Sequence, residues 1–485
     1  VPLIILSSDR PPELNEADAN QTIGQKKVYG NYLKGELHFE SPTMEIPPRS
    51  LRTSISHLVA KAHFSSFGGS GPVHINLPFR EPLDATIGDP PLCSAYLNQA
   101  KQTLGKRATI YAETYPQVSE QELQELVQKI QNTPKTLFVV GELAAWTKKK
   151  AFIELAERLN LPAYFDVLSS LKYRFPILAE TKEGSMGPCP SFDHPEVYQH
   201  FAQNPPELVI HLGGRLVSKH YYKFLQQNPN IELYTVNDGQ QKEDPSFQTT
   251  KRFIARPDIF AQNLVDYLKD VQLTREDFEF HHLNWLPFVQ KKQEVIENAP
   301  LTYPVISKAI IEQIPERSTL YLGNSTIIRS FDSYASESTS KELKILGHRG
   351  ASGIEGFISA TCGAADGDRD EGESPITLVL GDVATLHDLN GLYSLSKSRR
   401  PIVCFIVNNR GGGIFSLLPM EQTTDVKNMM MSPHEINFQK FAEGFHLDYV
   451  NIDNKNPLTE TYKRALETGR EQQRSPVIEL VFDPD

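Results

Sequence analysis

The sequence predicts an α/β protein of three consecutive doubly wound parallel-sheet domains, the first of them incomplete. Three observations lead to this prediction. Short apolar runs alternate with segments of helical periodicity along most of the chain. The 485 residues suffice for about three domains of ordinary size. The first region shows only two apolar runs and one long helix, which is too little for a complete layered domain.

The first region covers residues 1–84. The apolar run 1–6 predicts a buried strand, and residues 9–12 predict a turn. A helix is expected at about 51–66 and a second strand at 72–77. Because the chain opens inside a strand and without an initiator Met, we expect it to be a fragment or a processed product.

A linker rich in Pro and Asp is expected over 85–118, and a central domain follows over 119–270. Apolar runs and helical patterns alternate regularly in this domain, which is typical of a parallel sheet covered by helices. The expected strands are 136–141, 163–167, 208–212 and 232–236, and the expected helices are 119–130, 148–159, 195–203 and 257–268.

A charged and aromatic segment, 271–300, has no clear period and predicts a second linker. The alternation resumes over 301–485 and predicts a third α/β domain. Within it, residues 366–374 are acidic and rich in Gly, which indicates a solvated loop. The expected strands are 319–323, 343–346, 376–380, 402–407 and 477–481, and the expected helices are 305–314, 354–365, 387–396 and 458–468.

Composition excludes several classes of function. A net charge of −11 argues against a general nucleic-acid or membrane-surface role, because polyanion binding needs a basic face. The chain has no uninterrupted apolar stretch of about 18 residues, so we expect no membrane span. No signal peptide is visible, which favours a cytoplasmic location, and a plastid location would require a lost transit segment.

The four cysteines predict reduced thiols. Cys93, Cys189, Cys362 and Cys404 are scattered, and none forms a C-x-x-C pair. Cys362 and Cys404 lie inside apolar runs, where core packing is the expected role. This usage is typical of a cytoplasmic protein and not of a disulfide framework or a zinc site.

The most specific chemical signal is Gly381-Asp382 at the end of an apolar strand, with Asn408-Asn409 at the end of the next. Gly381 would let backbone N–H groups approach a phosphate closely, and a helix starting near residue 385 would point its positive end there. Asp382 and Asn409 supply hard oxygens of the kind that Mg2+ prefers. A Gly-Asp turn alone is more often structural, but Asn is a poor strand residue, and two of them followed by three glycines indicate more than packing.

These residues reproduce the thiamine-diphosphate motif, with 25 residues between Asp382 and Asn408. The text of 381–392, Gly-Asp-Val-Ala-Thr-Leu-His-Asp-Leu-Asn-Gly-Leu, and that of 408–419 closely resemble one branch. This branch is the 2-succinyl-5-enolpyruvyl-6-hydroxy-3-cyclohexene-1-carboxylate synthase family of menaquinone biosynthesis. Other segments along the chain are similar to the same family, namely 9–14, 19–21, 71–82, 323–329 and 349–355.

The resemblance implies a reaction and its cofactors. The family decarboxylates 2-oxoglutarate and adds the resulting succinyl semialdehyde anion to isochorismate, using thiamine diphosphate and Mg2+, with Mn2+ as an alternative ion. In this family, thiamine diphosphate carries the hard chemical step. By resemblance, the metal ligands are Asp382, Asn409 and Gly411, and the residues around the cofactor are Gly381, Asp382, Ser352, Ile354, Asn409, Ile414 and Phe415.

The resemblance also implies a substrate site rich in cations. Both substrates carry two carboxylates, and Arg binds a carboxylate through its planar fork. The implied substrate residues are Arg10, Asn20, Gln21, Lys219, Ser325, Arg329 and Arg349. Two positions depart from the family's pattern: His220 stands where Arg is expected, and Arg410 stands where a small polar residue is expected and predicts a side chain that faces solvent.

The family's catalytic Glu, which acts on the aminopyrimidine ring, belongs to the first part of the pyrimidine-binding domain. We expect it upstream of Val1, so the catalytic residue is unknown here and the chain as written is not expected to turn over. Subunits of this superfamily share their sites, which implies a homodimer or a homotetramer. No full dinucleotide fingerprint is present at residues 141 or 213–214, so we expect the central domain to be structural.

Two other functions compete with this interpretation. The first is another thiamine-diphosphate enzyme, such as an acetolactate synthase or a 2-oxoacid decarboxylase. A site for pyruvate has no use for the cations Arg10, Arg329 and Arg349, which disfavours it. The second is a catalytically inactive interaction or regulatory module, and the intact pair Asp382 and Asn409 disfavours that.

Overall fold

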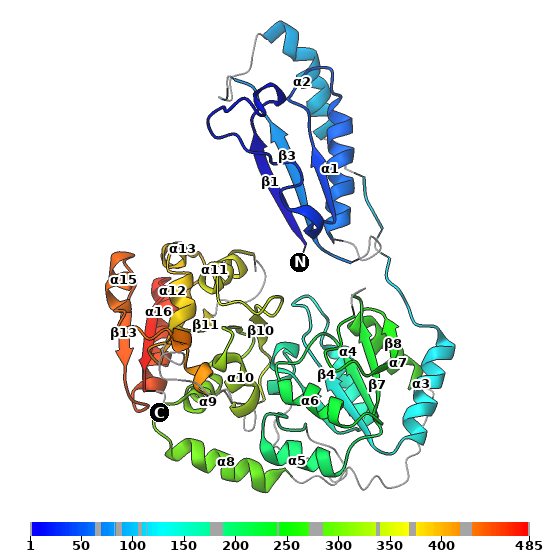
Figure 1. Cartoon of the computed structure of the whole chain (residues 1–485), viewed down its shortest axis with the longest axis vertical. Helices are drawn as coiled ribbons and strands as arrows, with labels where there is room; N and C mark the ends of the chain where they lie inside the picture. Colours follow the sequence, from blue (N-terminus) through cyan, green and yellow to red (C-terminus); the bar gives the residue numbers. More distant parts are fainter. Residues whose placement is uncertain are drawn as a thin grey trace. The chain divides into compact units, whose positions relative to one another are not determined.

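The structure is a computed structural model of the chain. It describes residues 2–63, 69–81, 83, 90–104, 109–112, 114–174, 188–239, 242–269, 271, 285–335, 340–367, 375–417 and 429–483. The chain forms two compact units: unit 1 holds residues 1–117 with 238–242 and 254–256, and unit 2 holds the rest (Figure 1). No described helix is both long and apolar enough to cross a membrane.

Unit 1 is built on a parallel three-stranded sheet with the order β1-β3-β2. Its small core lies between the sheet and α1, where Leu58 and Ala62 meet Val73 and Ile75. The elements are β1 (Leu3–Asp9), β2 (Gly35–His38), α1 (Pro48–His63), β3 (Pro72–Pro78) and α2 (Pro90–Leu104).

Unit 1 corrects three predictions. The first strand is not buried, because β1 is an edge strand and Leu3, Ile4 and Leu6 are 53%, 45% and 66% exposed. The strand β2 was not predicted, since its four residues include Gly and His and show no apolar run. The expected linker contains the helix α2, whose Tyr96 hydroxyl donates a hydrogen bond to the carbonyl of Ile46 (3.0 Å).

The central domain of unit 2 contains a five-stranded sheet with the order β5-β4-β6-β7-β8. Helix α3 begins where predicted, because the Ser119 side chain caps the backbone N–H of Glu122 (3.2 Å). The elements are α3 (Glu120–Asn132), β4 (Thr136–Val140), α4 (Lys150–Leu159), β5 (Ala163–Phe165), α5 (Pro195–Gln203), β6 (Leu208–Leu212), α6 (Lys219–Gln227), β7 (Glu232–Asn237), β8 (Thr249–Ile254) and α7 (Pro257–Tyr267).

The C-terminal domain of unit 2 contains a six-stranded parallel sheet with the order β10-β9-β11-β12-β14-β13. Apolar clusters cover both of its faces, as expected of a doubly wound sheet. The elements are α8 (Leu286–Asn298), α9 (Tyr303–Gln313), β9 (Thr319–Leu322), α10 (Thr326–Tyr334), β10 (Lys344–Gly347), α11 (Phe357–Gly367), β11 (Ile376–Gly381), α12 (Asp382–His387), α13 (Gly391–Lys397), β12 (Ile402–Asn408), α15 (Phe438–Gly444), β13 (Tyr449–Ile452), α16 (Leu458–Gln472) and β14 (Val477–Val481).

Two predictions for this domain need correction. The second expected linker contains α8, which buries Val289 and Ile296 on one face. The helix expected at 387–396 is two helices, α12 and α13, because the chain turns at Asp388, which accepts hydrogen bonds from the N–H and the hydroxyl of Ser359 (2.8 Å each). The expected loop 366–374 lies mostly outside the described residues.

A buried carboxylate joins the two domains of unit 2. Asp332, on α10 of the C-terminal domain, is fully buried, and its described hydrogen-bond and ion-pair partners all belong to the central domain. It accepts hydrogen bonds from the Tyr164 hydroxyl (2.6 Å), the Ser191 hydroxyl (2.9 Å) and the Val167 N–H (3.0 Å). The Lys172 ammonium lies 3.2 Å away. A buried charge with this many partners holds the domains in one arrangement.

Candidate active site

Two turns meet at the carboxyl end of the six-stranded sheet. Strands β11 and β12 pair in parallel with Gly381 opposite Val407, so the residues that follow them are neighbours. The N–H of Gly411 donates a hydrogen bond of 2.8 Å to Oδ2 of Asp382. We call Gly381, Asp382 and residues 408–411 the Asp382 turn.

Asp382 is the buried charge of this turn, with an exposed fraction of 2%. Its Oδ1 accepts a hydrogen bond from the N–H of Val383 (2.7 Å), and Nε2 of His434 lies 3.3 Å from its Oδ2 without hydrogen-bond geometry. Burial raises the pKa of Asp382, and the two backbone N–H groups and His434 oppose that rise. Among the described residues, His434 is the only basic side chain that forms an ion pair with Asp382.

The two asparagines have different surroundings. Asn408 is committed to the fold, because its amide donates to Glu479 (2.6 Å) and its Oδ1 accepts from the N–H of Arg410 (2.9 Å). Asn409 is 4% exposed, and no described residue hydrogen-bonds its side chain. Because the Asn409 side chain has no described hydrogen-bond partner, its amide oxygen is available to a ligand, so Asn409 is the one suited to bind a metal ion.

Two glycines of the turn, Gly411 and Gly381, differ in the space around them. Gly411 has a φ of +143°, and a Cβ there would lie 2.5 Å from the carbonyl of Met431. Gly381 has an ordinary φ of −81°, and a Cβ there would meet nothing within 4 Å. Gly411 is therefore required by the chain's own packing, whereas Gly381 borders open space.

The chemistry of these donors fits Mg2+ and a diphosphate. Asp382, the Asn409 amide and a carbonyl of the glycine run are hard oxygen donors, and the open side of Gly381 leaves room for phosphate oxygens. Helix α12 begins at Asp382, three residues earlier than predicted, and has only six residues. Arg410 has a φ of +61° and a side chain that is 61% exposed, so the prediction that it faces solvent is confirmed.

The remaining predicted cofactor residues lie on two loops of the same domain. Ile354 is half-buried and packs against the core beside α11. Ser352 is exposed and has a φ of +57°. Ile414 and Phe415 are half-buried in the short 3-10 helix Gly413–Leu417. Their roles toward the cofactor stay predictions.

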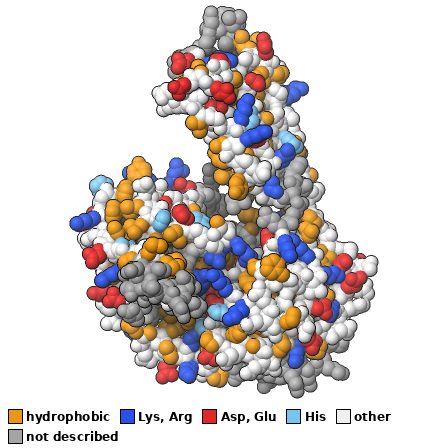
Figure 2. Space-filling model, in the orientation of Figure 1, with side chains coloured by type: hydrophobic (Ala, Val, Ile, Leu, Met, Phe, Trp, Pro, Cys, Tyr) orange, Lys and Arg blue, Asp and Glu red, His pale blue; other side chains and the backbone are white. Residues whose placement is uncertain are grey.

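Three arginines gather where the central and C-terminal domains meet. Arg329 and Arg349 were predicted, and the structure adds Arg215, whose Nη2 donates to the carbonyls of Arg349 (2.7 Å) and Gly350 (2.9 Å). We call Arg215, Arg329 and Arg349 the arginine seam. Basic side chains are visible along this border in Figure 2. Ser325, also predicted, has a φ of +67° and its carbonyl accepts a hydrogen bond from Arg329 (2.6 Å).

The arginines of the seam affect one another and also face acidic neighbours. Burial lowers the pKa of Arg349, and the neighbouring Arg329 lowers it further. Burial also lowers the pKa of Arg329, against the opposing charge of Asp193. Burial raises the pKa of Glu142, which Arg349 and Arg215 oppose. Half-buried cations that repel one another are suited to bind an anion with several carboxylates.

Lys219 and His220 begin helix α6. Lys219 is exposed, and its predicted approach to the substrate stays a prediction. His220 hydrogen-bonds Asp193 (3.0 Å), and that bond raises the pKa of the histidine. His220, which stands where Arg is expected, is therefore hydrogen-bonded to Asp193, and the charge of Asp193 also acts on Arg329.

The other predicted substrate residues, Arg10, Asn20 and Gln21, belong to unit 1. Asn20 and Gln21 are exposed, and Gln21 has a φ of +59°. The N–H of Arg10 donates to Asp9 (2.8 Å), whose other carboxylate oxygen accepts from Asn76 (2.7 Å). These contacts fix the backbone at Asp9 and Arg10 within unit 1.

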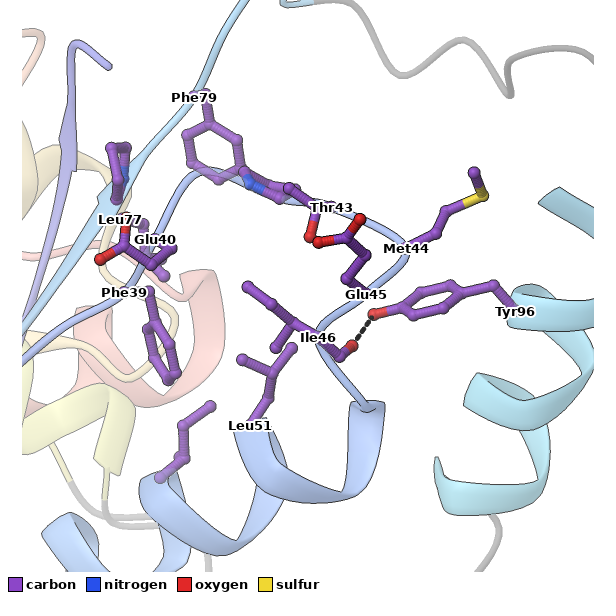
Figure 3. Close-up of a pocket in the computed structure, with 13 residues that line it drawn as sticks. Phe39, Glu40, Thr43, Met44, Glu45, Ile46, Leu51, Leu77, Phe79 and Tyr96 are labelled. Atoms are coloured by element: carbon purple, nitrogen blue, oxygen red, sulfur yellow. Dashed lines mark hydrogen bonds between the residues drawn. The ribbon is translucent and has the colours of Figure 1, made fainter. Parts of the chain in front are cut away.

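Unit 1 also contains a cavity of about 710 Å³ beyond the ends of β2 and β3 (Figure 3). Its lining is mainly apolar, with Phe39, Leu51 and Phe79, and among the described lining residues only Glu40 and Glu45 are charged. A dianion would be repelled by these carboxylates, so the cavity is unsuited to either predicted substrate.

In the central domain, the backbone turns that follow β4 and β6 pack closely against each other. A Cβ on Gly141 would lie 2.0 Å from the carbonyl of Gly214, and one on Gly213 would lie 2.7 Å from the carbonyl of Glu142. The N–H of Gly214 donates to Glu142 (2.8 Å). This close backbone packing lies at the ends of β4 and β6, where a dinucleotide binds in related sheets, and the structural role of the domain stays a prediction.

Comparisons with known proteins agree with this geometry. Residues 94–270 match the family model described as the middle domain of thiamine pyrophosphate enzymes, and residues 335–479 match the C-terminal TPP-binding domain. The benzoylformate decarboxylase structure from Polynucleobacter necessarius matches with a TM-score of 0.67 and 15% identity, over 100% of this chain and 82% of that one. This likeness shows the fold.

Relatives with higher identity share one name. The 2-succinyl-5-enolpyruvyl-6-hydroxy-3-cyclohexene-1-carboxylate synthase of Syntrophus aciditrophicus is 32% identical over 100% of this chain and 80% of its own length. The synthase of Chlorobium phaeovibrioides is 31% identical over 99% of this chain and 79% of its own. The chain therefore belongs to the 2-succinyl-5-enolpyruvyl-6-hydroxy-3-cyclohexene-1-carboxylate synthase family of thiamine-diphosphate enzymes.

Proposed function

We propose that the protein decarboxylates 2-oxoglutarate and joins the remaining four-carbon unit to isochorismate, forming 2-succinyl-5-enolpyruvyl-6-hydroxy-3-cyclohexene-1-carboxylate for menaquinone biosynthesis. The observation that supports this most is the meeting of Asp382 with residues 408–411 in a chain of the synthase family. When bound, thiamine diphosphate supplies the electron sink for decarboxylation.

In this proposal the Asp382 turn holds the cofactor. Asp382 and Asn409 bind Mg2+ through their side-chain oxygens and Gly411 through its carbonyl, and the open side of Gly381 admits the diphosphate. Ile354, Ile414 and Phe415 surround the cofactor with apolar side chains and exclude water from the reacting atoms.

The arginine seam binds the substrates. Arg329 in helix α10 and Arg349 in the loop after β10 are half-buried cations of the C-terminal domain, next to the Ser325 backbone and the Asn324 side chain that orient them. Each offers N–H donors to a carboxylate in a partly desolvated site, where such bonds are strong. Arg10, Asn20, Gln21 and Lys219 complete the proposed substrate set.

We also propose that the protein works as a homodimer or a homotetramer in the cytoplasm. The cysteines Cys189, Cys362 and Cys404 are buried free thiols, which suits a reducing compartment. Sedimentation with and without cofactor would measure the assembly, and a monomer in both states would contradict this part of the proposal.

The reaction can be tested on protein expressed from its complete reading frame, with thiamine diphosphate, Mg2+ and 2-oxoglutarate. We expect release of CO2, and coupled consumption of isochorismate when it is added. Absence of CO2 release contradicts the synthase function, and release without coupling indicates a decarboxylase. Pyruvate is the matched control substrate, because it lacks the second carboxylate that the arginine seam is proposed to bind.

A further inference from the structure

Arg215 connects the central domain to a loop that carries two predicted site residues. Its Nη2 donates hydrogen bonds to the carbonyl oxygens of Arg349 (2.7 Å) and Gly350 (2.9 Å). The loop, residues 348–356, runs between β10 and α11 and also carries Ile354. One guanidinium group from another domain therefore holds two consecutive carbonyls of this loop.

Arg215 itself starts from a rigid turn. It follows Gly213, which has a φ of +90°, and Gly214, whose N–H donates to the carbonyl of Glu142 (2.8 Å). A Cβ on Gly213 would lie 2.7 Å from that same carbonyl. Because the turn cannot shift without breaking this packing, the arginine is anchored at its base.

The same loop is held from within its own domain by Asn324, which is 6% exposed. Its amide donates to the carbonyls of His348 (2.8 Å) and Gly353 (2.6 Å), and its Oδ1 accepts from Nη1 of Arg349 (3.0 Å). Asn324 thus fixes positions near both ends of the loop, and Arg215 fixes the part between them.

The charge on Arg215 points to more than a structural anchor. Arg215 stands close enough to Arg349 that its charge helps to lower the pKa of that guanidinium, after burial and Arg329. Placing Arg215 beside Arg349 is unfavourable to the extent that Glu142, which faces both arginines, does not offset their repulsion. It is favourable when a substrate with two carboxylates binds, because it adds to the positive potential of the site.

We propose that Arg215 is a positioning residue of the substrate site. It holds the 348–356 loop so that Arg349 faces a substrate carboxylate and Ile354 keeps its place beside the cofactor. The roles of Arg349 and Ile354 rest on the proposed function, whereas the anchoring of the loop does not. The central domain then contributes to substrate binding and is more than a spacer.

The test compares Arg215→Met, Arg215→Lys and the matched control Arg174→Met. The Met change removes both hydrogen bonds at similar side-chain length, and Lys keeps a cation and its donors. The control also removes an Arg at the border of the two domains, since Arg174 Nη1 lies 3.7 Å from Oε2 of Glu342, but it leaves the loop carbonyls untouched.

Two readouts separate the anchoring from the activity. Amide hydrogen exchange in peptides over 348–356 should accelerate about tenfold or more in Arg215→Met and return toward the original rate in Arg215→Lys. The KM for 2-oxoglutarate should rise about tenfold or more in the Met variant, with a smaller change in kcat and partial rescue by Lys. The Arg174→Met control should match the unchanged protein in both.

Each outcome decides a separate claim. Equal exchange and equal KM in Arg215→Met and the unchanged protein overturn the positioning role. Faster exchange with an unchanged KM overturns it as well, because the anchor then serves the fold alone. If the unchanged protein releases no CO2, the proposed function fails, and the exchange data still establish or refute the anchoring.

Discussion

The Asp382 turn and the arginine seam lie in one unit of the molecule but are built in different ways. The Asp382 turn comes from two adjacent strands of one sheet, and its key hydrogen bond joins residues 29 positions apart. In the arginine seam, Arg215 contacts carbonyls 134 and 135 positions further along the chain and in another domain. The cofactor end therefore depends on local backbone geometry, and the substrate end depends on how two domains pack.

The largest expected effect concerns the packing of the two domains, on which the arginine seam depends. Asp332→Ala removes the buried carboxylate that the central domain surrounds, and with it the ion pair of the buried Lys172 ammonium, which keeps only its bond to the Phe165 carbonyl and its contact with the Tyr164 ring among the described residues. We expect a loss of about 3–5 kcal/mol in the free energy of unfolding. Urea denaturation measures it, and a loss below about 1 kcal/mol would show that this carboxylate does not hold the domains together.

Two glycine substitutions test the backbone geometry of the Asp382 turn. Gly411→Ala forces a left-handed backbone and a contact of 2.5 Å with the Met431 carbonyl, so we expect a stability loss of about 1–3 kcal/mol as well as weak cofactor binding. Gly381→Ala meets no protein atom within 4 Å, so its stability should stay within about 0.5 kcal/mol while cofactor binding weakens.

Thermal unfolding and thiamine-diphosphate titration measure both effects. A Gly381→Ala protein that binds the cofactor normally would show that the open space beside Gly381 is not the diphosphate site. A Gly411→Ala protein of unchanged stability would show that the turn relaxes around a side chain.

A pH-dependent effect is expected at the border of the two domains of unit 2. His194 is buried beside Lys292 and the Ser333 carbonyl, and burial lowers its pKa to about 3 from the usual 6.5. Between these values only the unfolded chain binds the proton, so stability falls as the pH is lowered from about 6.5 toward 3. The slope from this one group approaches about 1.4 kcal/mol per pH unit.

Unfolding experiments from pH 7 to pH 4 should show a shallower loss of stability in His194→Gln than in the unchanged protein. Parallel slopes in the two proteins would contradict the assignment of this proton to His194.

Much of the site could be predicted where chemistry follows directly from local sequence. Asp382, Asn409 and Gly411 stand at strand ends in a glycine-rich context, and the strand pattern alone brings them to the same edge of the sheet. Arg329 and Arg349 were found because the text around them resembles a family. Both routes depend on sequence motifs that can be read without the tertiary structure.

The features that sequence analysis missed depend on tertiary contacts, which produce no recognisable pattern in the local sequence. Arg215 was missed because its acceptors are backbone carbonyls, which every residue has. Helix α8 was missed because it buries only Val289 and Ile296, and most of the residues between them are charged or polar. Strand β1 looked buried because its residues are apolar, but an edge position leaves them exposed. In each case tertiary packing decides, and the local sequence does not record it.

The most direct test of the account is the binding of thiamine diphosphate in the presence of Mg2+ to the unchanged protein, to Asp382→Asn and to the control Asp366→Asn, measured by calorimetry. Asp366 is an exposed aspartate of the same domain. We expect Asp382→Asn to weaken metal-dependent binding about 100-fold or more, because a neutral amide replaces the buried charge that faces the ion, and Asp366→Asn to bind normally. Equal affinity in all three proteins would contradict the claim that the Asp382 turn holds the cofactor through a metal ion.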